Sequence, residues 1–146
     1  IAGNDRGGKC RPDWISKDRK TIVDLKTTVS AERKSFQRSV MNYGYHISAA
    51  WYMGGIELVT GIKPEEFIWI AIEKKAPFGI GIYKADPELL EYGSQLCEEA
   101  LIKINEWDRA NYYPSHTEGV ELMGLPPWLK KKEGVTPQNY QEIELY

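Results

Sequence analysis

A short β-branched segment that carries two opposite charges most constrains how this chain can fold. Residues 21–27 read Thr-Ile-Val-Asp-Leu-Lys-Thr, a composition typical of a β-strand. Because side chains alternate across a strand, Asp24 and Lys26 share one face and lie roughly 7 Å apart. Val23 and Leu25 then point the other way, and we expect them to pack into a core. Two charges on one face of a strand whose other face is apolar predict a site.

The segment before this strand is a candidate pairing partner. The stretch 16–20 is polar and turn-prone, which predicts that residues 9–15 and 21–27 form a hairpin. The register of the hairpin decides which side chains share a face. If Asp13 lies opposite Asp24, the two carboxylates come within bridging distance of one hard cation. If Asp13 lies opposite Val23, they point to opposite faces and no such site forms.

These residue types favour metal-dependent phosphate chemistry. Mg²⁺, or Mn²⁺ in its place, would be held by Asp13, Asp24 and the backbone carbonyl of Leu25, together with water and substrate phosphate. The metal would lower the pKa of a bound water and stabilise charge on the scissile phosphate. Lys26 would orient or deprotonate that water and neutralise the developing negative charge. The alternative is that Asp24 and Lys26 merely solvate a half-exposed strand.

Three ordered segments carry a resemblance to a known family. They are Cys10-Arg11-Pro12-Asp13, Val23-Asp24-Leu25-Lys26-Thr27-Thr28 and Tyr45-His46-Ile47-Ser48-Ala49-Ala50-Trp51-Tyr52. In this order they resemble the PD-(D/E)XK nucleases, and more narrowly the RecE (exonuclease VIII) group, whose relatives include phage lambda exonuclease and RecB-type nuclease domains. The likeness is dense from about Lys9 to Gly61 and thinner beyond. The later Leu125-Pro126-Pro127-Trp128 is similar to the end of the RecE domain.

The resemblance implies a fold, an activity and partners. The fold would be α/β with a restriction-endonuclease-like core, in which a mixed central β-sheet is flanked by helices. The activity would be that of a processive, Mg²⁺-dependent 5′→3′ exonuclease on the ends of double-stranded DNA, in phage or prophage recombination. Such enzymes form ring-shaped homo-oligomers and work with a RecT-like single-strand annealing protein. Asp13 and Asp24 match the family's metal ligands, Lys26 its catalytic lysine, and Tyr52 the tyrosine of a helix motif that reads Gln-x-x-x-Tyr.

The sequence departs from the family pattern in two ways. Ser48 stands where the helix motif has glutamine, which puts in doubt the contact that this glutamine makes. The chain also enters the hairpin almost at once, whereas family members carry an upstream helical region with a further acidic or histidine ligand. We therefore expect residues 1–128 to be the C-terminal part of a nuclease domain and residues 129–146 to be a tail. Such a fragment could be inactive by itself.

The distribution of charge favours a nucleic-acid partner more than the net charge of −2 does. Residues 1–38 hold ten Lys and Arg against five Asp and Glu, a balance of +5, and the remainder holds nine against sixteen, a balance of −7. Basic side chains supply most of the affinity for phosphate, and the basic part contains the predicted site. The candidate DNA contacts are Ser48, Tyr52, Arg11, Arg33, Lys34 and Arg38. Alternatively, the basic residues simply solvate the hairpin and a helix face.

The remaining elements follow from periodicity and capping signals. We expect a helix over 31–42 capped by Ser30, a second over 45–60, a strand over 66–73 that is buried on both faces, a strand over 79–83, and a long helix from Pro87 to about Arg109 capped by Asp86. His46 is expected to be a packed histidine rather than a metal ligand. The sequence after Asn111 is irregular, and Lys130–Lys132 are expected to be solvated.

Composition narrows the remaining functional classes. Two cysteines are too few for a disulfide framework or for the iron–sulfur cluster found in some RecB-like nucleases. No targeting signal or membrane-spanning run appears, so we expect a cytoplasmic protein with no membrane partner. Two functions remain open at this point. One is a metal-dependent DNA exonuclease, and the other is a DNA-binding or assembly module that keeps the nuclease fold without turnover.

Overall fold

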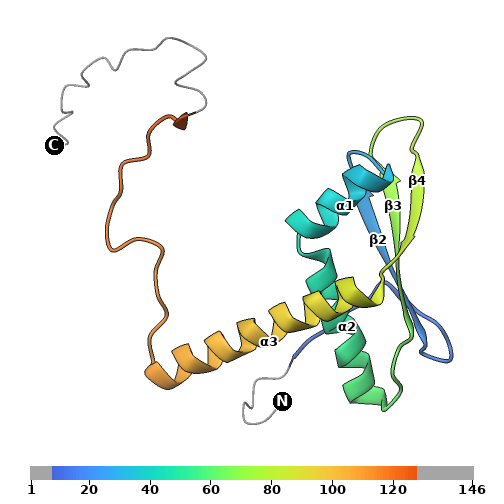
Figure 1. The fold of residues 1–146 in the computed structure, drawn as a ribbon, viewed down its shortest axis with the longest axis horizontal. Coiled ribbons are helices and arrows are strands. Elements are labelled where there is room, and N and C mark those ends of the chain that lie inside the picture. Colours follow the sequence, from blue (N-terminus) through green and yellow to red (C-terminus); the bar gives the residue numbers. More distant parts are fainter. Residues whose placement is uncertain (1–7, 128–146) are drawn as a thin grey trace. The chain divides into compact units, whose positions relative to one another are not determined.

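Two strands that pair in parallel, β2 (Thr21–Thr28) and β3 (Glu66–Glu73), form the centre of the sheet (Figure 1). The computed structural model describes residues 8–127. A short strand, β1 (Trp14–Ile15), pairs antiparallel with β2, and β4 (Ile80–Lys84) pairs antiparallel with β3. The sheet order is therefore β1-β2-β3-β4, with mixed pairing. The predicted α/β class with a mixed sheet and flanking helices is confirmed.

Three helices accompany the sheet. They are α1 (Arg33–Asn42), α2 (Tyr45–Thr60) and α3 (Pro87–Ala110). The helices α1 and α2 form the crossover that a parallel pair of strands requires. Figure 1 shows both on one side of the sheet, with α3 packed across α2. Among the described residues no helix is long and apolar enough to span a bilayer.

The β1–β2 hairpin forms with the expected turn but with a shorter first strand. Ser16 N–H donates to the Thr21 carbonyl at 2.9 Å, which closes the predicted 16–20 turn. Only Trp14 and Ile15 have strand structure, so the expected strand over 9–15 is wrong at its start. The preceding residues cross α2 instead, because Trp51 Nε1–H donates to the Lys9 carbonyl at 3.2 Å.

The faces of β2 are the reverse of those expected. Ile22 and Asp24 are buried on the side of the helices, whereas Leu25 is 50% exposed. The prediction that Val23 and Leu25 point into the core is therefore wrong. Strand β3 is likewise buried on one face only: Phe67, Trp69 and Ala71 are buried, and the isoleucines between them are half-buried.

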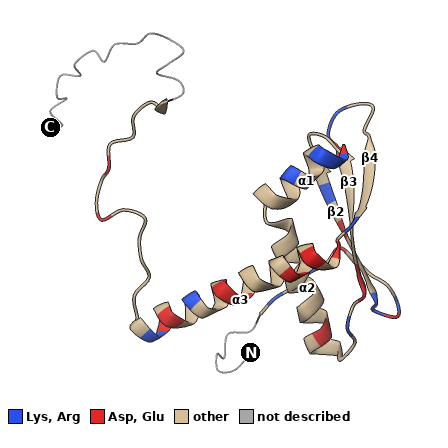
Figure 2. Cartoon of the chain, in the orientation of Figure 1, with Lys and Arg blue, Asp and Glu red and all other residues tan. Residues whose placement is uncertain are grey.

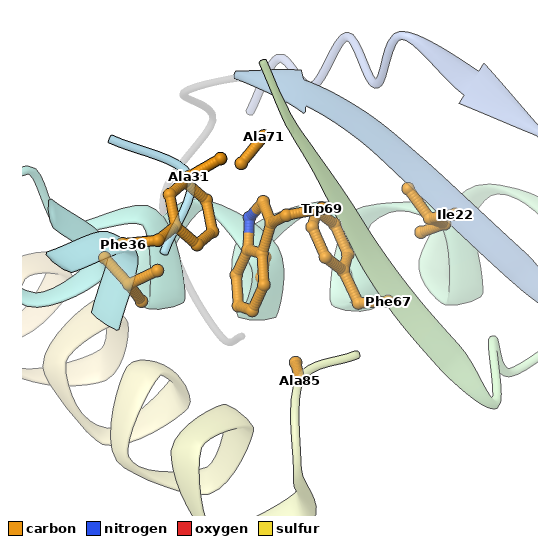
Figure 3. Close-up of a cluster of buried hydrophobic side chains, with 9 residues drawn as sticks. Ile22, Ala31, Phe36, Phe67, Trp69, Ala71 and Ala85 are labelled. Carbon is orange, nitrogen blue, oxygen red and sulfur yellow. The ribbon is translucent and has the colours of Figure 1, made fainter. Parts of the chain in front are cut away.

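An aromatic cluster between the sheet and α1 forms the core (Figure 3). Phe36 of α1 stacks on Tyr83 of β4 with ring centroids 5.2 Å apart and meets the edge of Trp69 at 6.5 Å. Trp69 in turn lies 5.3 Å from Phe67. Aromatic side chains bury large areas, so these rings account for much of the area that joins α1 to the sheet.

The start of α1 is fixed by two carboxylates. Glu32, rather than the predicted Ser30, is the N-cap, and its carboxylate accepts from the backbone N–H groups of Lys34 and Ser35 at 3.0 and 3.1 Å. These N–H groups hold the pKa of Glu32 below its ordinary value. Glu73, at the end of β3, accepts from the Ala31 N–H at 2.9 Å, which ties the helix start to the sheet.

Helix α3 begins as predicted and packs very closely on α2. Asp86 caps it by accepting from the Leu89 N–H at 2.7 Å, with Pro87 in the first turn. Gly93 is buried against α2, where a Cβ atom would lie 2.3 Å from the carbonyl oxygen of His46. His46 is itself buried and stacks on Tyr92, so its prediction as a packed histidine is confirmed.

A second unit begins after Tyr112. Its described residues, 113–127, are mostly exposed and have irregular backbone up to a final helical residue. This agrees with the irregular sequence expected there. Trp128, Lys130–Lys132 and the predicted tail over 129–146 lie outside the described residues.

We expect Gly93→Ala to lower the free energy of unfolding by about 1–3 kcal/mol, because the added methyl group must displace backbone of α2. The matched control is Gly54→Ala, where a Cβ meets nothing within 4 Å. That change should raise the free energy of unfolding by about 0.4–1 kcal/mol. Urea denaturation followed by circular dichroism measures both, and equal effects of the two changes would contradict the close contact between α2 and α3.

Candidate active site

The position of Asp13 relative to Asp24 depends on the register of the hairpin. Trp14 pairs with Val23, and one further step along the antiparallel strands sets Asp13 opposite Asp24. This is the register that a shared cation requires. Asp13 directly contacts Leu25, the residue after Asp24, because the Leu25 N–H donates to Asp13 Oδ2 at 2.7 Å. The side chain of Asp13 is thus held beside the backbone that carries Asp24.

Asp24 is a buried carboxylate that forms an ion pair with Lys26. Asp24 is only 4% exposed, and its Oδ2 contacts Lys26 Nζ. The Asp24 side chain is 6% exposed and that of Lys26 is 23% exposed, so the lysine reaches the carboxylate from the more open side. An isolated carboxylate at this depth would be costly. Lys26 compensates that charge within the described structure.

Tyr45, at the start of α2, is the second residue whose side chain contacts Lys26. The Nζ atom of Lys26 lies 4.8 Å from the centroid of the Tyr45 ring, a distance at which the ring face attracts a cation. The ring of Tyr45 also lies 6.3 Å from Phe36 and 5.7 Å from Tyr43. The motif over 45–52 includes Tyr45 but does not predict its contact with Lys26. No local signal could have done so, because the contact joins a strand to a helix 19 residues further along the chain.

The donor set suits a hard divalent cation. Asp13 is exposed, and the register continued by one residue sets it opposite the second carboxylate, that of Asp24. Oxygen donors of this kind are those that Mg²⁺ prefers. Residues 8–127 contain no group of three or more His, Cys, Asp or Glu side chains placed to hold a metal. The two aspartates would therefore have to share a cation with water and phosphate. The role of the Leu25 carbonyl stays a prediction.

The basic candidate DNA contacts lie on α1 and on the segment that precedes β1. Arg33, Lys34 and Arg38 are exposed along α1, where Figure 2 shows basic segments. Arg11 is exposed in the segment that leads into β1. Their contact with DNA stays a prediction.

The two residues of the predicted helix motif lie on α2. The ring of Tyr52 packs 6.5 Å from that of Phe67, and the hydroxyl of Ser48 donates to the Gly44 carbonyl at 3.5 Å. Both side chains are half-buried. The described contacts thus tie Tyr52 to the core and Ser48 to its own helix, and their roles toward DNA stay predictions.

A family model described as "PDDEXK-like domain of unknown function (DUF3799)" matches residues 5–126. The chain belongs to this family. The predicted PD-(D/E)XK relationship is thereby confirmed, while the assignment of Asp13, Asp24 and Lys26 to its motif stays a prediction.

A solved crystal structure has a fold similar to that of this chain. The crystal structure of a "Putative exonuclease" from Eubacterium rectale is similar with a TM-score of 0.56 at 20% sequence identity. The similarity covers 79% of this chain and 48% of that chain, so the chain spans about half the length of that protein. No curated protein matches the chain.

We expect Lys26→Met to lower the free energy of unfolding by about 2–4 kcal/mol in the presence of EDTA, because Asp24 is left as a buried charge without its cation. The double change of Lys26→Met with Asp24→Asn should lower the free energy of unfolding by less than the sum of the two single changes. The difference, which is the coupling energy, should be about 1–3 kcal/mol.

The exposed pair of Lys20 and Glu65, with Nζ and Oε1 2.6 Å apart, provides the control for this double-mutant cycle. Lys20→Met should change stability little, because both partners keep their contact with water. Additive effects of Asp24→Asn and Lys26→Met in urea denaturation would contradict the buried ion pair.

Proposed function

We propose that this domain is a Mg²⁺-dependent nuclease that hydrolyses phosphodiester bonds at the ends of linear double-stranded DNA. The observation that carries this proposal is the buried pair of Asp24 and Lys26 with Asp13 bound at the neighbouring Leu25 N–H. In a member of a PDDEXK-like family, that arrangement supports a site in which the two carboxylates and the ammonium group act on one phosphate. A purely solvated strand face would not bury an aspartate at this depth.

Each residue has a role that its surroundings support. Asp13 and Asp24 would hold the divalent cation, which when bound lowers the pKa of water and stabilises charge on phosphate. With Asp24 engaged as a metal ligand, Lys26 would be free to face the substrate. Its ammonium group can then orient the attacking water and offset the negative charge on the phosphate oxygens. Tyr45 keeps that ammonium group on the same face of the sheet.

The proposed reaction is a hydrolysis in which one bond to phosphorus forms and one breaks. An oxygen of water forms a new bond to phosphorus, and the bond from phosphorus to the leaving oxygen breaks. One proton of the water leaves during attack, and the leaving oxygen takes up a proton to become a hydroxyl group. No oxidant or second substrate is needed.

The finer properties rest on the resemblance to RecE-like enzymes. We propose 5′→3′ polarity, a ring-shaped homo-oligomer around the duplex, and a role in phage or prophage recombination beside a single-strand annealing protein. A DNA-binding or assembly module without turnover is the second candidate. The observation that favours it is Ser48, whose hydroxyl is bound within α2 at a position where the family motif has glutamine.

A cleavage assay separates the two candidates. Linear duplex labelled at either end should lose its 5′ label in Mg²⁺, and Asp13→Asn, Asp24→Asn or Lys26→Met should slow that loss by at least about 10²-fold. Lys17→Ala, in the exposed hairpin turn, is the control and should cleave normally. Mg²⁺ should also raise the thermal midpoint of the unchanged chain but not of the aspartate variants. Binding of duplex without cleavage would favour the second candidate.

We expect Tyr45→Leu to slow single-turnover cleavage about 2- to 30-fold, which corresponds to the loss of a cation–π contact of about 0.5–2 kcal/mol. Tyr45→Phe keeps the ring face and should retain the rate. Tyr43→Leu is the control, because that ring contacts Tyr45 and is 70% exposed. Equal losses in the Phe and Leu variants would show that the hydroxyl, rather than the ring face, is what matters.

A further inference from the structure

The turn between β3 and β4 combines two lysines with an exposed aromatic ring. Residues 74–79 read Lys-Lys-Ala-Pro-Phe-Gly, and both lysines are exposed. Phe78 is 57% exposed, although a ring of that size is normally buried. Figure 2 shows basic residues in this turn as well as at the start of α1. None of residues 74–79 belongs to the candidate active site or to the candidate DNA contacts on α1.

The turn is held firmly rather than left loose. Lys74 N–H donates to the Thr28 carbonyl at 3.0 Å, and Phe78 N–H donates to the Lys75 carbonyl at 2.8 Å. Glu73, just before the turn, donates its N–H to the Gly79 carbonyl at 2.9 Å. These bonds fix the lysines and the ring at the end of β2.

Phe78 adopts a backbone conformation that disfavours it. Its φ is +59°, in the left-handed region that bulky residues rarely occupy. Glycine would adopt this conformation without strain. A strained and exposed phenylalanine costs stability in the free protein, which is the pattern expected where a side chain is retained for binding.

The basic charge around the turn extends onto α1. Glu73 bonds to the Ala31 N–H, so the turn adjoins the helix start that bears Arg33 and Lys34. The acidic groups at this end are Glu73 and Glu32, and both carboxylates accept backbone N–H groups. Arg33, Lys34, Lys74 and Lys75 carry four positive charges against the two negative charges of Glu32 and Glu73, so the balance of these six residues is +2.

The turn lies within reach of a substrate bound at the candidate active site. Lys26 is paired with Ala71 across β2 and β3, and Lys74 follows three residues later, roughly 10 Å along the strand. That distance corresponds to about three nucleotide steps of 3.4 Å on a DNA strand. A duplex with its scissile phosphate near Lys26 can thus carry neighbouring phosphates over the turn.

We propose that Lys74 and Lys75 bind phosphates of the DNA next to the cleaved bond and that Phe78 stacks on an unpaired or terminal base. The proposal rests on DNA being the substrate in the proposed function. Lysines supply affinity without reading sequence, and an aromatic face accepts any base. This surface would hold the DNA end in place while the aspartates and Lys26 act on it.

The test measures binding of an end-labelled duplex with a short single-stranded overhang, by fluorescence anisotropy in EDTA over a range of salt concentrations. Lys74→Ala/Lys75→Ala should reduce the slope of log affinity against log salt by about 1.8, the value for two lost phosphate contacts. The matched control is Lys17→Ala/Lys63→Ala. These two exposed lysines precede β2 and β3, at the end of the strands away from the β3–β4 turn. The control should keep the slope of the unchanged chain.

A second variant tests the aromatic ring separately. Phe78→Gly should weaken binding of the overhang duplex about five-fold or more, while the thermal midpoint stays the same or rises. Phe78→Tyr keeps the ring and should bind normally. A fall in the midpoint of Phe78→Gly with unchanged binding would assign the ring a structural role and overturn that part of the proposal.

The outcomes separate this proposal from the proposed function. Because EDTA prevents cleavage, the expected change in slope would support the DNA-binding turn even if the chain hydrolyses nothing. Cleavage by the unchanged chain together with an unaltered slope in Lys74→Ala/Lys75→Ala would leave the nuclease in place and overturn the turn as a contact. Equal slope changes in the control pair would also overturn it.

Discussion

A buried carboxylate must find a cation, and this requirement organises the centre of the sheet. Asp24 lies on the helix-covered face, in line with Ile22 of the core, where an unpaired charge would be costly. Lys26, two residues further on, meets that requirement from the same face. The ammonium group of Lys26 also contacts the ring face of Tyr45, which attracts a cation. The Asp24–Lys26 ion pair and the Tyr45 ring thus together account for a buried charge beside the core.

The hairpin adds the second carboxylate through its register. The turn over 16–20 closes with the Ser16–Thr21 hydrogen bond, and that closure sets Trp14 against Val23. A slip of one residue would send Asp13 to the other face. Its contact with the Leu25 N–H then fixes the side chain independently of the short strand. The short strand of two residues is thus enough to position Asp13, because the closed turn and the hydrogen bond from the Leu25 N–H also restrain it.

The sequence predicted elements better than faces. Capping signals placed α3, and the nearly continuous apolar run over 66–73 predicted the bounds of β3, although not its burial on one face only. The face of β2 was predicted wrongly because apolar residues occur on both sides of Thr21–Thr28: Ile22 shares the face of Asp24, and Leu25 lies opposite. Only the packing of α1 and α2 decides which side is covered. The contacts of Tyr45 with Lys26 and of Glu73 with Ala31 join distant segments, so no local pattern predicts them.

Parallel pairing explains why the candidate active site and the basic turn occur at one end of the molecule. Strands β2 and β3 run the same way, so their carboxyl ends meet at the same edge of the sheet. Ligand sites in α/β sheets favour that edge. Had β3 run antiparallel to β2, the Lys74–Gly79 turn would have adjoined the 16–20 turn, far from Lys26. The crossover through α1 and α2 is therefore what places the β3–β4 turn at the end of β2 that follows Asp24 and Lys26.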